Sequence, residues 1–550
     1  MCPLQSKETY IAASTAQKTK AYDMYTRFLR WATDRLQDNG IVAFVSNNSF
    51  IDAKTLDGFR KIVCEEFNDI YVVNMKGNAN TSGEMRQRQG GNVFNDQIKV
   101  GVAVYFLVKR KGQKDCKIHY TEVPDFWDAE QKKAYLKDNP LSRIEFEHIR
   151  PDAKYHWLGQ TENDWSNFLP VANKDTKSAK SDVLENAIFR LYSLGVVTNR
   201  DEWVYDFELQ KLEDEVKFLI KSYNKDVSRI KSGEIQNVEN DVNYQIKWTR
   251  AVKNDLRVGL KYSFDATKIR SALYRPFVTS YLYFDSQLNE MRYQTPSIFP
   301  ESDTENILIA FDVSDKPFSA LASKYLVDLH FNGDSQCLPL YRFENGNRLE
   351  NITDFALNAF RTHYKNNHIS REQIFHYVYA VLHHPAYREK YALNLRQEFP
   401  RIPYYDNFKT WADWGKKLLT LHLEFETAKP YKLEVITEKP DTENQEALER
   451  LLKGKLKADK DANEIVLDGL TILRGIPNKA WDYKLGNRSA LEWVLERYKE
   501  TTPKDPTIKE RFNTYRFRDY KDHVIDLLKR VCTVSLETMK IIQEMPAETI

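Results

Sequence analysis

The sequence predicts an α/β fold at the start of the chain, followed by an α+β region and a mainly helical region. Three apolar runs, Ile41–Val45, Ile70–Val73 and Val100–Val108, are rich in Val, Ile, Phe and Tyr and are bounded by turn residues, as buried strands are. Between the first two runs, Leu56–Phe67 has the apolar periodicity of a helix. Apolar strands joined by a helix indicate part of a sheet that is covered on both faces.

Two further patterns extend this prediction along the chain. Residues 245–345 alternate short aromatic runs with turn residues, which is typical of an α+β region. From residue 350 onward, long segments carry apolar residues at helical spacing, and Ser370 with Gln373 forms a capping box before one of them. We therefore expect an α/β part over residues 1–112, an α+β part over 113–345 and a mainly helical part over 346–550.

Other helices are expected from the same periodicity. Tyr22–Leu36 places its apolar residues on one face and is followed by the stop signal Asn39-Gly40. A helix is also expected from Ser181, through VLENAIFRLYSLG. A long charged helix over Leu209–Ser232 follows, and its many charges are more typical of a solvated face than of a binding arm.

The composition fits a protein with more than one hydrophobic core. The chain has 550 residues, of which 42% are hydrophobic, and 81 basic residues nearly balance 79 acidic ones, for a net charge of +2. This balance does not favour a non-specific polyanion binder, although it leaves room for a local basic groove. No apolar run approaches the roughly 18 residues that span a membrane, and the first residues lack the apolar stretch of a secretory signal.

Motifs for several kinds of chemistry are missing from the sequence. The five cysteines form no CxxC pair, which argues against a disulfide framework or a cysteine zinc site and favours the cytoplasm. The P-loop, GxGxxG, GxSxG and HExxH motifs are absent. Adjacent His383 and His384 point in different directions on a helix, so they and His422 are more typical of packed residues than of metal ligands. No metal is expected.

Two polar loops follow or precede the predicted strands, and each has two interpretations. Asn47 and Asn48 come directly after the first strand, where side-chain amides can position a ligand; the alternative is a helix-capping turn with Ser49 or Asp52 as the cap. Phe94 lies at the entry of the last strand, where an aromatic ring can stack on a base; the alternative is a core residue.

Long ordered stretches of the sequence resemble one enzyme family. They include YDMYTRFLRWATDRLQDNGIVAFVSNNSFID, GGNVFNDQIKVGVAVYFLVK, VVTNRDEWVYDF, IRSALYRPFVTSYLYFD, FHYVYAVLHHPAYREKYALNLRQEFPRIP and WDYKLGNRSALEWVLERY. The chain resembles the methyltransferase and specificity portion of type ISP restriction–modification enzymes. These are single-chain bacterial enzymes with nuclease, helicase-like ATPase, N6-adenine methyltransferase and target-recognition regions.

The resemblance implies a fold and a site. Residues 1–112 would form the C-terminal portion of a gamma-class adenine methyltransferase domain, with a partial Rossmann-like sheet. Phe94 would stack on the flipped target base, and Asn47, Asn48 and Phe50 would line the same pocket. The residues after 113 would form the target-recognition region. The implied partners are double-stranded DNA and, in the complete enzyme, S-adenosylmethionine, in the cytoplasm of a bacterium.

The departures from the family are informative. No NPPY-type catalytic tetrapeptide occurs in the sequence, and RIPYY at 401–405 is in the wrong place. The glycine-rich S-adenosylmethionine loop is also missing. In the family both precede the helix that begins with YDMY, so we expect a C-terminal fragment, a split-gene product or a truncated frame. Such a chain would be catalytically incomplete and would need the missing methyltransferase, helicase and nuclease part.

Candidate DNA contacts in the recognition region combine arginines with aromatic residues in predicted turns. An arginine can contact phosphate or the O6/N7 edge of guanine, and loops present it well. The alternative for each is a structural residue that braces a turn. The candidates are Arg200, Trp203, Tyr205, Tyr274, Arg275, Arg401, Tyr404, Tyr405, Asn487 and Arg488.

Three hypotheses on function remain open at this point. The first is a part of an adenine methyltransferase together with its DNA-specificity region. The second is a non-catalytic DNA-recognition module that acts as a specificity subunit in trans. The third is an inert, truncated remnant whose half-sheet does not fold properly.

Overall fold

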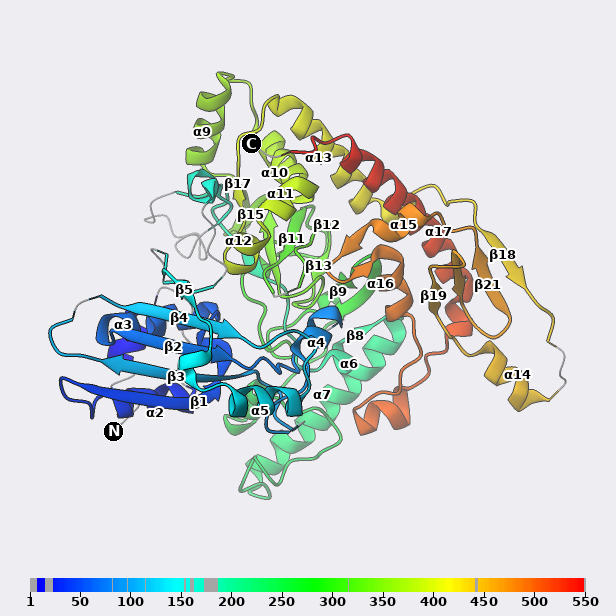
Figure 1. Cartoon of the computed structure of the whole chain (residues 1–550). Helices are drawn as coiled ribbons and strands as arrows, with labels where there is room; N and C mark the ends of the chain where they lie inside the picture. The colour runs from blue at the N-terminus through cyan, green and yellow to red at the C-terminus, as the bar shows by residue number, and fades with distance from the viewer. Residues whose placement is uncertain are drawn as a thin grey trace. The chain divides into compact units, whose positions relative to one another are not determined.

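The computed structural model of the chain forms two compact units, Met1–Glu162 and Asn163–Ile550 (Figure 1). The structure describes residues 7–14, 23–81, 83–95, 97–113, 115–152, 155–158, 163–172, 186–314, 316–440 and 444–548. In these residues, no helix has both the length and the apolar character that crossing a membrane requires.

The first unit contains a five-stranded mixed sheet with the strand order β1-β3-β2-β4-β5. Only β2 and β4 pair in parallel, and β3 runs antiparallel between β1 and β2. The strands are β1 (Gly40–Asn47), β2 (Asp69–Asn74), β3 (Val102–Lys109), β4 (Lys117–Glu122) and β5 (Glu147–Ile149). The helices are α2 (Met24–Thr33), α3 (Asp57–Glu66), α4 (Gly83–Gln89) and α5 (Ala129–Asp138).

Both faces of this sheet are covered at its central strands β2 and β3, as the apolar strands predict, whereas Ile41 and Val45 of β1 are exposed. Successive residues of a strand point to opposite faces, and Val72 packs with Leu29 of α2 and Phe59 of α3, whereas Val73 packs with Val102 in a second cluster that Tyr135 of α5 borders. The predicted strands and the helix over 56–67 are confirmed. The expected end of this part at residue 112 falls inside the sheet, because β4 and β5 also belong to it.

The second unit combines three four-stranded sheets with long helices. The sheets have the orders β13-β9-β10-β8, β12-β11-β14-β7 and β18-β21-β20-β19. The strands are β6 (Leu169–Pro170), β7 (Ser193–Leu194), β8 (Tyr205–Asp206), β9 (Ile269–Arg275), β10 (Val278–Tyr283), β11 (Leu308–Asp312), β12 (Ala320–Ser323), β13 (Leu326–Val327), β14 (Ser335–Pro339), β15 (Tyr341–Glu344), β16 (Asn347–Glu350), β17 (Arg401–Ile402), β18 (Glu434–Thr437), β19 (Lys457–Asp459), β20 (Glu464–Val466), β21 (Thr471–Arg474), β22 (Lys484–Leu485) and β23 (Arg488–Ser489).

The helices of this unit include the predicted long charged helix, which spans Leu209–Lys231 as α7. The others are α6 (Asp201–Val204), α8 (Arg250–Arg257), α9 (Asp354–Tyr364), α10 (Arg371–His383), α11 (Pro385–Lys390), α12 (Ala392–Gln397), α13 (Phe408–Leu423), α14 (Gln445–Leu452), α15 (Asn478–Asp482), α16 (Ala490–Arg497) and α17 (Phe517–Gln543).

Helix α10 begins at the predicted capping box, with both of its reciprocal hydrogen bonds formed. It is buried on all sides from Ile374 to His383, which is more than the single apolar face that its sequence predicts. Its close neighbour is α13, where a Cβ on Gly415 would lie 1.7 Å from the carbonyl oxygen of His376. The two helices can approach this closely only because residue 415 has no side chain.

The expected helix from Ser181 is wrong over residues 186–195, the part that the structure describes. This segment is extended, with a bridge from Phe189 to Ile352 and with β7 paired to β14. The backbone N–H of Leu191 donates to the side chain of Asn351. The physical reason is that a short, continuously buried apolar run fits an extended segment as well as a helix, so periodicity cannot separate the two.

Candidate nucleic-acid interface

The polar loop after β1 forms a rigid turn. The side-chain oxygen of Asn47 accepts hydrogen bonds from the backbone N–H (2.9 Å) and the hydroxyl (2.8 Å) of Ser49, so Asn47 caps the short helix Asn48–Phe50. The capping interpretation therefore holds, with Asn47 as the cap in place of Ser49 or Asp52. The Asn47 oxygen is therefore occupied by the cap, whereas the side chain of Asn48 points toward β2.

A network of amides and hydroxyls links the ends of three strands. Asn48 donates to the Oδ1 atom of Asn74 at the end of β2 (2.9 Å), and Asn74 donates to the hydroxyl of Tyr120 on β4 (3.0 Å). Tyr120 in turn donates to Glu122 (2.7 Å), and Glu122 forms an ion pair with Lys76 (3.0 Å). The network holds Asn48 in a fixed orientation at this end of the sheet.

Phe50 is a core residue and not a wall of an open pocket. Its ring is buried and lies 4.7 Å from the ring of Tyr105 and 5.8 Å from that of Phe59, between centroids. The predicted pocket role of Phe50 is therefore not supported by this conformation, because neighbouring rings cover the side chain.

Phe94 is 57% exposed on a loop whose backbone is held firmly. Its N–H donates to the side-chain oxygen of buried Asn92 (3.1 Å), and Asn92 donates to the carbonyl of Val100 (2.9 Å). Gly90 has a positive φ of 62°, and a Cβ there would lie 2.0 Å from the carbonyl oxygen of Trp127. The loop thus presents an aromatic ring to solvent from a fixed backbone, as a stacking platform requires.

Lys132 of α5 binds the backbone of the loop that carries Phe94. This role was not predicted from the sequence. Its ammonium group is buried and donates to the carbonyls of Gln89 (2.8 Å) and Gly91 (2.7 Å). Burial lowers its pKa to about 8. Nothing in AEQKKAYLKD distinguishes Lys132 from exposed Lys133, so the sequence carries no signal for this role.

Four of the recognition-region candidates lie in the interior of the second unit: Arg200, Trp203, Tyr205 and Tyr405. The indole N–H of Trp203 donates to Asp505 (2.8 Å), and Arg200 donates to the hydroxyl of Thr249 (2.6 Å). Burial lowers the pKa of Arg200 to about 10. The prediction that these side chains contact DNA is not supported by this conformation, because core residues surround them.

Tyr274 and Arg275 are half-buried and bonded to carboxylates. The hydroxyl of Tyr274 donates to Asp201 (2.7 Å), and Arg275 pairs with Asp328 (2.8 Å). The guanidinium of Arg275 also lies 3.9 Å from the centroid of the Tyr274 ring. This arrangement matches the bracing alternative, in which the pair fixes the β9–β10 hairpin.

Arg401 and Tyr404 have similar bracing contacts. Arg401 donates to the carbonyls of Ser166 (3.4 Å) and Phe168 (3.3 Å), next to the pairing of β17 with β6. The ring of Tyr404 stacks on that of His363 with 4.0 Å between centroids. Arg401 thus ties residues 166–168 to β17, and Tyr404 packs against α9.

Asn487 and Arg488 differ from the other candidates because they lie at the exposed tip of a hairpin. Strands β22 and β23 pair around Gly486-Asn487, and Gly486 has the positive φ (65°) that a tight two-residue turn requires. Arg488 is 46% exposed, with its guanidinium 5.0 Å from the Trp493 ring and 3.8 Å from Glu496. A rigid turn with an exposed arginine is well suited to contact a groove or a phosphate.

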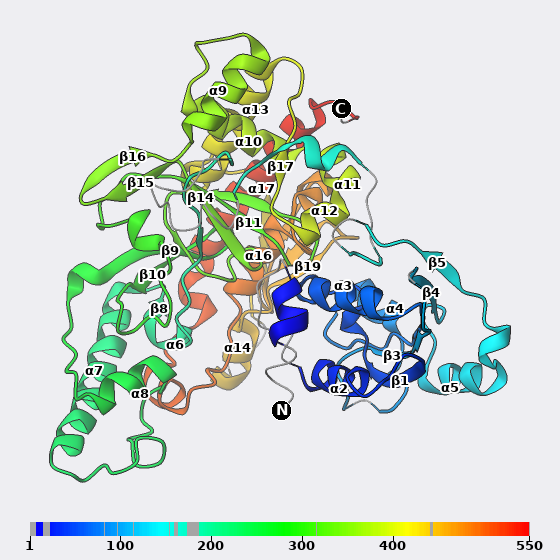
Figure 2. The ribbon, with the colours of Figure 1, turned by 90° about the vertical axis from the view of Figure 1, so that its left-hand side faces the viewer.

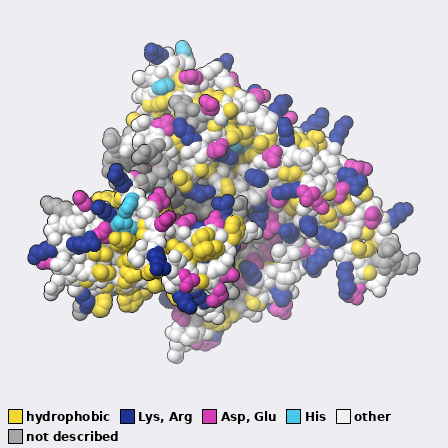
Figure 3. All heavy atoms as spheres, viewed as in Figure 1, with side chains coloured by type: hydrophobic (Ala, Val, Ile, Leu, Met, Phe, Trp, Pro, Cys, Tyr) yellow, Lys and Arg dark blue, Asp and Glu magenta, His cyan; other side chains and the backbone are white. Residues whose placement is uncertain are grey.

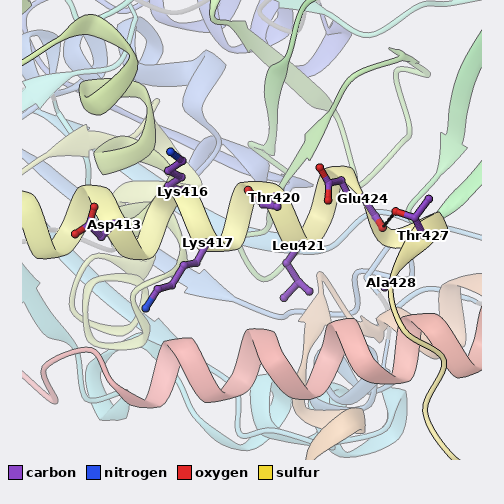
Figure 4. Close-up of a pocket in the computed structure, with 8 residues that line it drawn as sticks. All are labelled: Asp413, Lys416, Lys417, Thr420, Leu421, Glu424, Thr427 and Ala428. Atoms are coloured by element: carbon purple, nitrogen blue, oxygen red, sulfur yellow. Dashed lines mark hydrogen bonds between the residues drawn. The ribbon is translucent and has the colours of Figure 1, made fainter.

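A groove in the second unit contains none of these candidates. The groove, of about 580 Å³, runs along α13 and is lined by Asp413, Lys416, Lys417, Thr420, Leu421, Glu424, Thr427 and Ala428. Figure 4 shows Lys417 and Leu421 on the side of α13 that faces α17. Charges of both signs and no aromatic ring line it, so it offers neither a base-stacking surface nor a catalytic set. Among the described residues, no group of three or more His, Cys, Asp or Glu side chains could hold a metal ion.

Comparison with known proteins defines the class of protein to which this fold belongs. Residues 187–527 match the family model described as the type ISP C-terminal specificity domain. The chain therefore belongs to this family, and the resemblance drawn from the sequence is confirmed. Curated protein sequences give no match.

Three solved structures match over the full length of the chain. One described as a DrdV–DNA complex has 58% identity and a TM-score of 0.92. A nuclease-deletion mutant of the type ISP restriction–modification enzyme LlaGI, in complex with a DNA substrate mimic, has 30% identity and a TM-score of 0.83. The ATP-dependent type ISP enzyme LlaBIII bound to DNA has 28% identity and a TM-score of 0.85. The chain spans 54%, 42% and 35% of their lengths.

Proposed function

We propose that this chain is the DNA-sequence-recognition part of a restriction–modification enzyme of the type ISP class, acting on double-stranded DNA in the bacterial cytoplasm. The observation that carries the proposal is the match of residues 187–527 to a specificity domain. The similarity over the whole chain to proteins described as DNA complexes supports it.

The exposed hairpin of Asn487 and Arg488 is the best-placed sequence reader among the predicted residues. Arginine forms a bidentate contact with guanine O6 and N7, and asparagine forms one with adenine N6 and N7. Because the short turn fixes the backbone of both residues between β22 and β23, binding costs little backbone entropy.

We further propose that recognition is coupled to N6-adenine methylation, with the first unit as part of a Rossmann-like methyltransferase sheet. Exposed Phe94 would stack on a flipped adenine, and Asn48, fixed by Asn74, would lie beside it. Extruding a base costs a few kcal/mol, which stacking of about 1–3 kcal/mol per base offsets in part.

An uncovered edge supports a sheet that continues into another part of a longer enzyme. Among the described residues, β1 pairs only with β3, and Ile41 and Val45 are 63% and 52% exposed. On α2, Met24, Phe28 and Trp31 are also exposed. Figure 3 shows hydrophobic side chains gathered over this part of the first unit. Apolar surface of this kind marks an interaction site, here for the remaining methyltransferase portion.

The residues present do not fit S-adenosylmethionine. The turn after β1 contains Asn47, Asn48 and Ser49 and no glycine, and the Asn47 Oδ1 atom is committed to capping and the Asn48 Nδ2 atom to Asn74. We therefore assign no residue of this chain to the cofactor, and we expect the chain alone to transfer no methyl group.

A selection from random DNA duplexes with the purified chain tests the proposal. Enrichment of one short sequence is expected. Salt-sensitive binding without enrichment would contradict sequence recognition. Methyl transfer from labelled S-adenosylmethionine by this chain alone would contradict the missing cofactor and catalytic parts.

The second candidate, a non-catalytic specificity subunit, is favoured by the lack of the catalytic tetrapeptide in the sequence. A reconstitution experiment distinguishes this candidate from a part of a methyltransferase. Adding a methyltransferase portion that contains the tetrapeptide should restore methylation at the selected site if the chain is part of a methyltransferase.

A further inference from the structure

Residues 244–261, at the far end of α7, concentrate positive charge in a chain that is almost neutral overall. The segment contains five basic residues and one acidic residue. The acidic residue, Asp255, accepts a hydrogen bond from the hydroxyl of Tyr262 (2.7 Å). The excess of basic residues over acidic ones is therefore a local feature of this segment, because the chain as a whole has a net charge of only +2.

Three of the five cations are available for a ligand: Lys247, Arg250 and Lys261. All three are exposed, and among the described residues no ion pair involves Lys247 or Lys261. Arg250 lies 3.6 Å from Glu290 and keeps 83% of its side chain exposed. The other two, Lys253 and Arg257, both bind Glu239.

The segment is held rigidly on α7, as a docking surface must be. Val252 and Leu256 of α8 are completely buried in the core of the unit. Asn224 of α7 donates to the carbonyl of Tyr262 (2.8 Å) and accepts from its N–H (3.0 Å). Figure 2 shows α8 beside α7, with the connecting loop beyond them.

Exposed apolar side chains accompany the cations. Tyr244 is 68% exposed and Val258 is 79% exposed. A rigid surface with three exposed cations and one exposed aromatic ring complements the sugar–phosphate backbone of DNA, where cations contact phosphates and an amphipathic ring can lie against sugar.

We propose that Lys247, Arg250 and Lys261 bind the phosphate backbone of duplex DNA, beside the sequence that the recognition region reads. This inference rests on the proposed function and adds a second contact surface to it. Phosphate contacts position a protein on the duplex and carry no sequence information. The long charged helix α7 (Leu209–Lys231) would support this surface without contacting DNA itself, so the predicted solvated face of α7 stays a prediction.

The test compares two triple variants of the full chain by DNA binding at several salt concentrations. The first is Lys247→Ala, Arg250→Ala and Lys261→Ala. The matched control is Lys453→Ala, Lys455→Ala and Lys457→Ala, which removes the same charge from three exposed lysines elsewhere in the unit. Thermal unfolding of both should match the unaltered chain, because all six side chains are exposed.

The expected result is a loss of affinity of about 10- to 100-fold for the first variant, equal for the selected site and for random duplexes. The slope of log affinity against log salt should also fall by about 0.9 for each phosphate that the variant no longer neutralises. The control should lose less than about threefold. Equal losses in both variants, or a loss confined to the selected site, would overturn the inference. If the unaltered chain binds the selected duplex and neither variant changes binding, the inference fails and the proposed function stands. If the unaltered chain binds no duplex DNA, both fail.

Discussion

Phe94 in the first unit and Trp203 in the second were both predicted as site residues, and the structure places them in opposite environments. In the first unit, Phe94 stays exposed on a loop that Lys132 and Asn92 hold in place. In the second, Trp203 and Arg200 are buried, although the same reasoning placed arginine and aromatic rings in a recognition turn. The difference teaches that an arginine next to an aromatic residue is as good a brace for a core as it is a ligand for DNA.

Replacing Trp203 gives the largest expected effect on this comparison. The ring stacks on Phe218 with 6.1 Å between centroids, so Trp203→Ala should lower the free energy of unfolding by about 3–5 kcal/mol. Exposed Trp31 is the matched control, and Trp31→Ala should change the free energy of unfolding by less than about 0.5 kcal/mol. Denaturant unfolding measures both. Loss of DNA binding by Trp203→Ala without loss of stability would instead make Trp203 a DNA contact.

A buried acid on α7 gives the next largest effect. Burial, with a further contribution from Asp206, raises the pKa of Glu215 to about 9, and one of its carboxylate oxygens has no hydrogen-bond donor among the described residues. The pKa is higher in the folded state than its ordinary 4.5, so stability falls as pH rises from about 4.5 to 9 and the loss is complete above 9.

Glu215→Gln should remove this pH dependence and raise the free energy of unfolding at pH 8 by several kcal/mol. Exposed Asp214 is the neighbouring control, and Asp214→Asn should keep most of the pH dependence, because the Asp214 charge makes the smallest contribution to the raised pKa of Glu215. The measurement is thermal or denaturant unfolding across this pH range. An unchanged profile for Glu215→Gln would mean that the carboxyl is ionised in the folded protein.

Within the second unit, exposed Arg488 at the β22–β23 turn can be compared with the half-buried, ion-paired Arg275. Arg488→Ala should weaken binding to the selected DNA site by about 1–3 kcal/mol and relax specificity there, while stability changes by less than about 0.5 kcal/mol. Arg275→Ala should do the reverse, because Arg275 pairs with buried Asp328. Competition binding and unfolding together separate the two roles. A loss of stability in Arg488→Ala would assign it a bracing role as well.

The smallest change in stability is expected at Phe94. Phe94→Ala should leave the free energy of unfolding within about 0.5 kcal/mol, because the ring is exposed. In a complete enzyme it should weaken methylation more than DNA binding. Buried Phe50 is the control, and Phe50→Ala should destabilise the first unit by about 3–5 kcal/mol. Equal losses of methylation and binding in Phe94→Ala would indicate a folding role.

The strands of the first unit were predictable because their short apolar runs are rich in Val, Ile and Tyr and are bounded by turn residues, which together favour a strand over a helix. The capping box of α10 was predictable because Ser370 and Gln373 act within one turn. The burial of Trp203 was not predictable, because its partner Asp505 is 302 positions further along the chain. Lys132 was hidden for the same reason: its two carbonyl partners come from a loop more than 40 positions upstream.

The open edge of β1 has a practical consequence for handling the protein. Among the described residues β1 is an edge strand, and an edge strand that exposes Ile41 and Val45 is a template for pairing with another copy; the apolar side of α2 beside it adds to the attraction. A lysine introduced at position 41 or 45 should keep the purified chain monomeric at high concentration. The same lysine should interfere with assembly when the rest of an enzyme is supplied, so one substitution reports on both solubility and completion of the sheet.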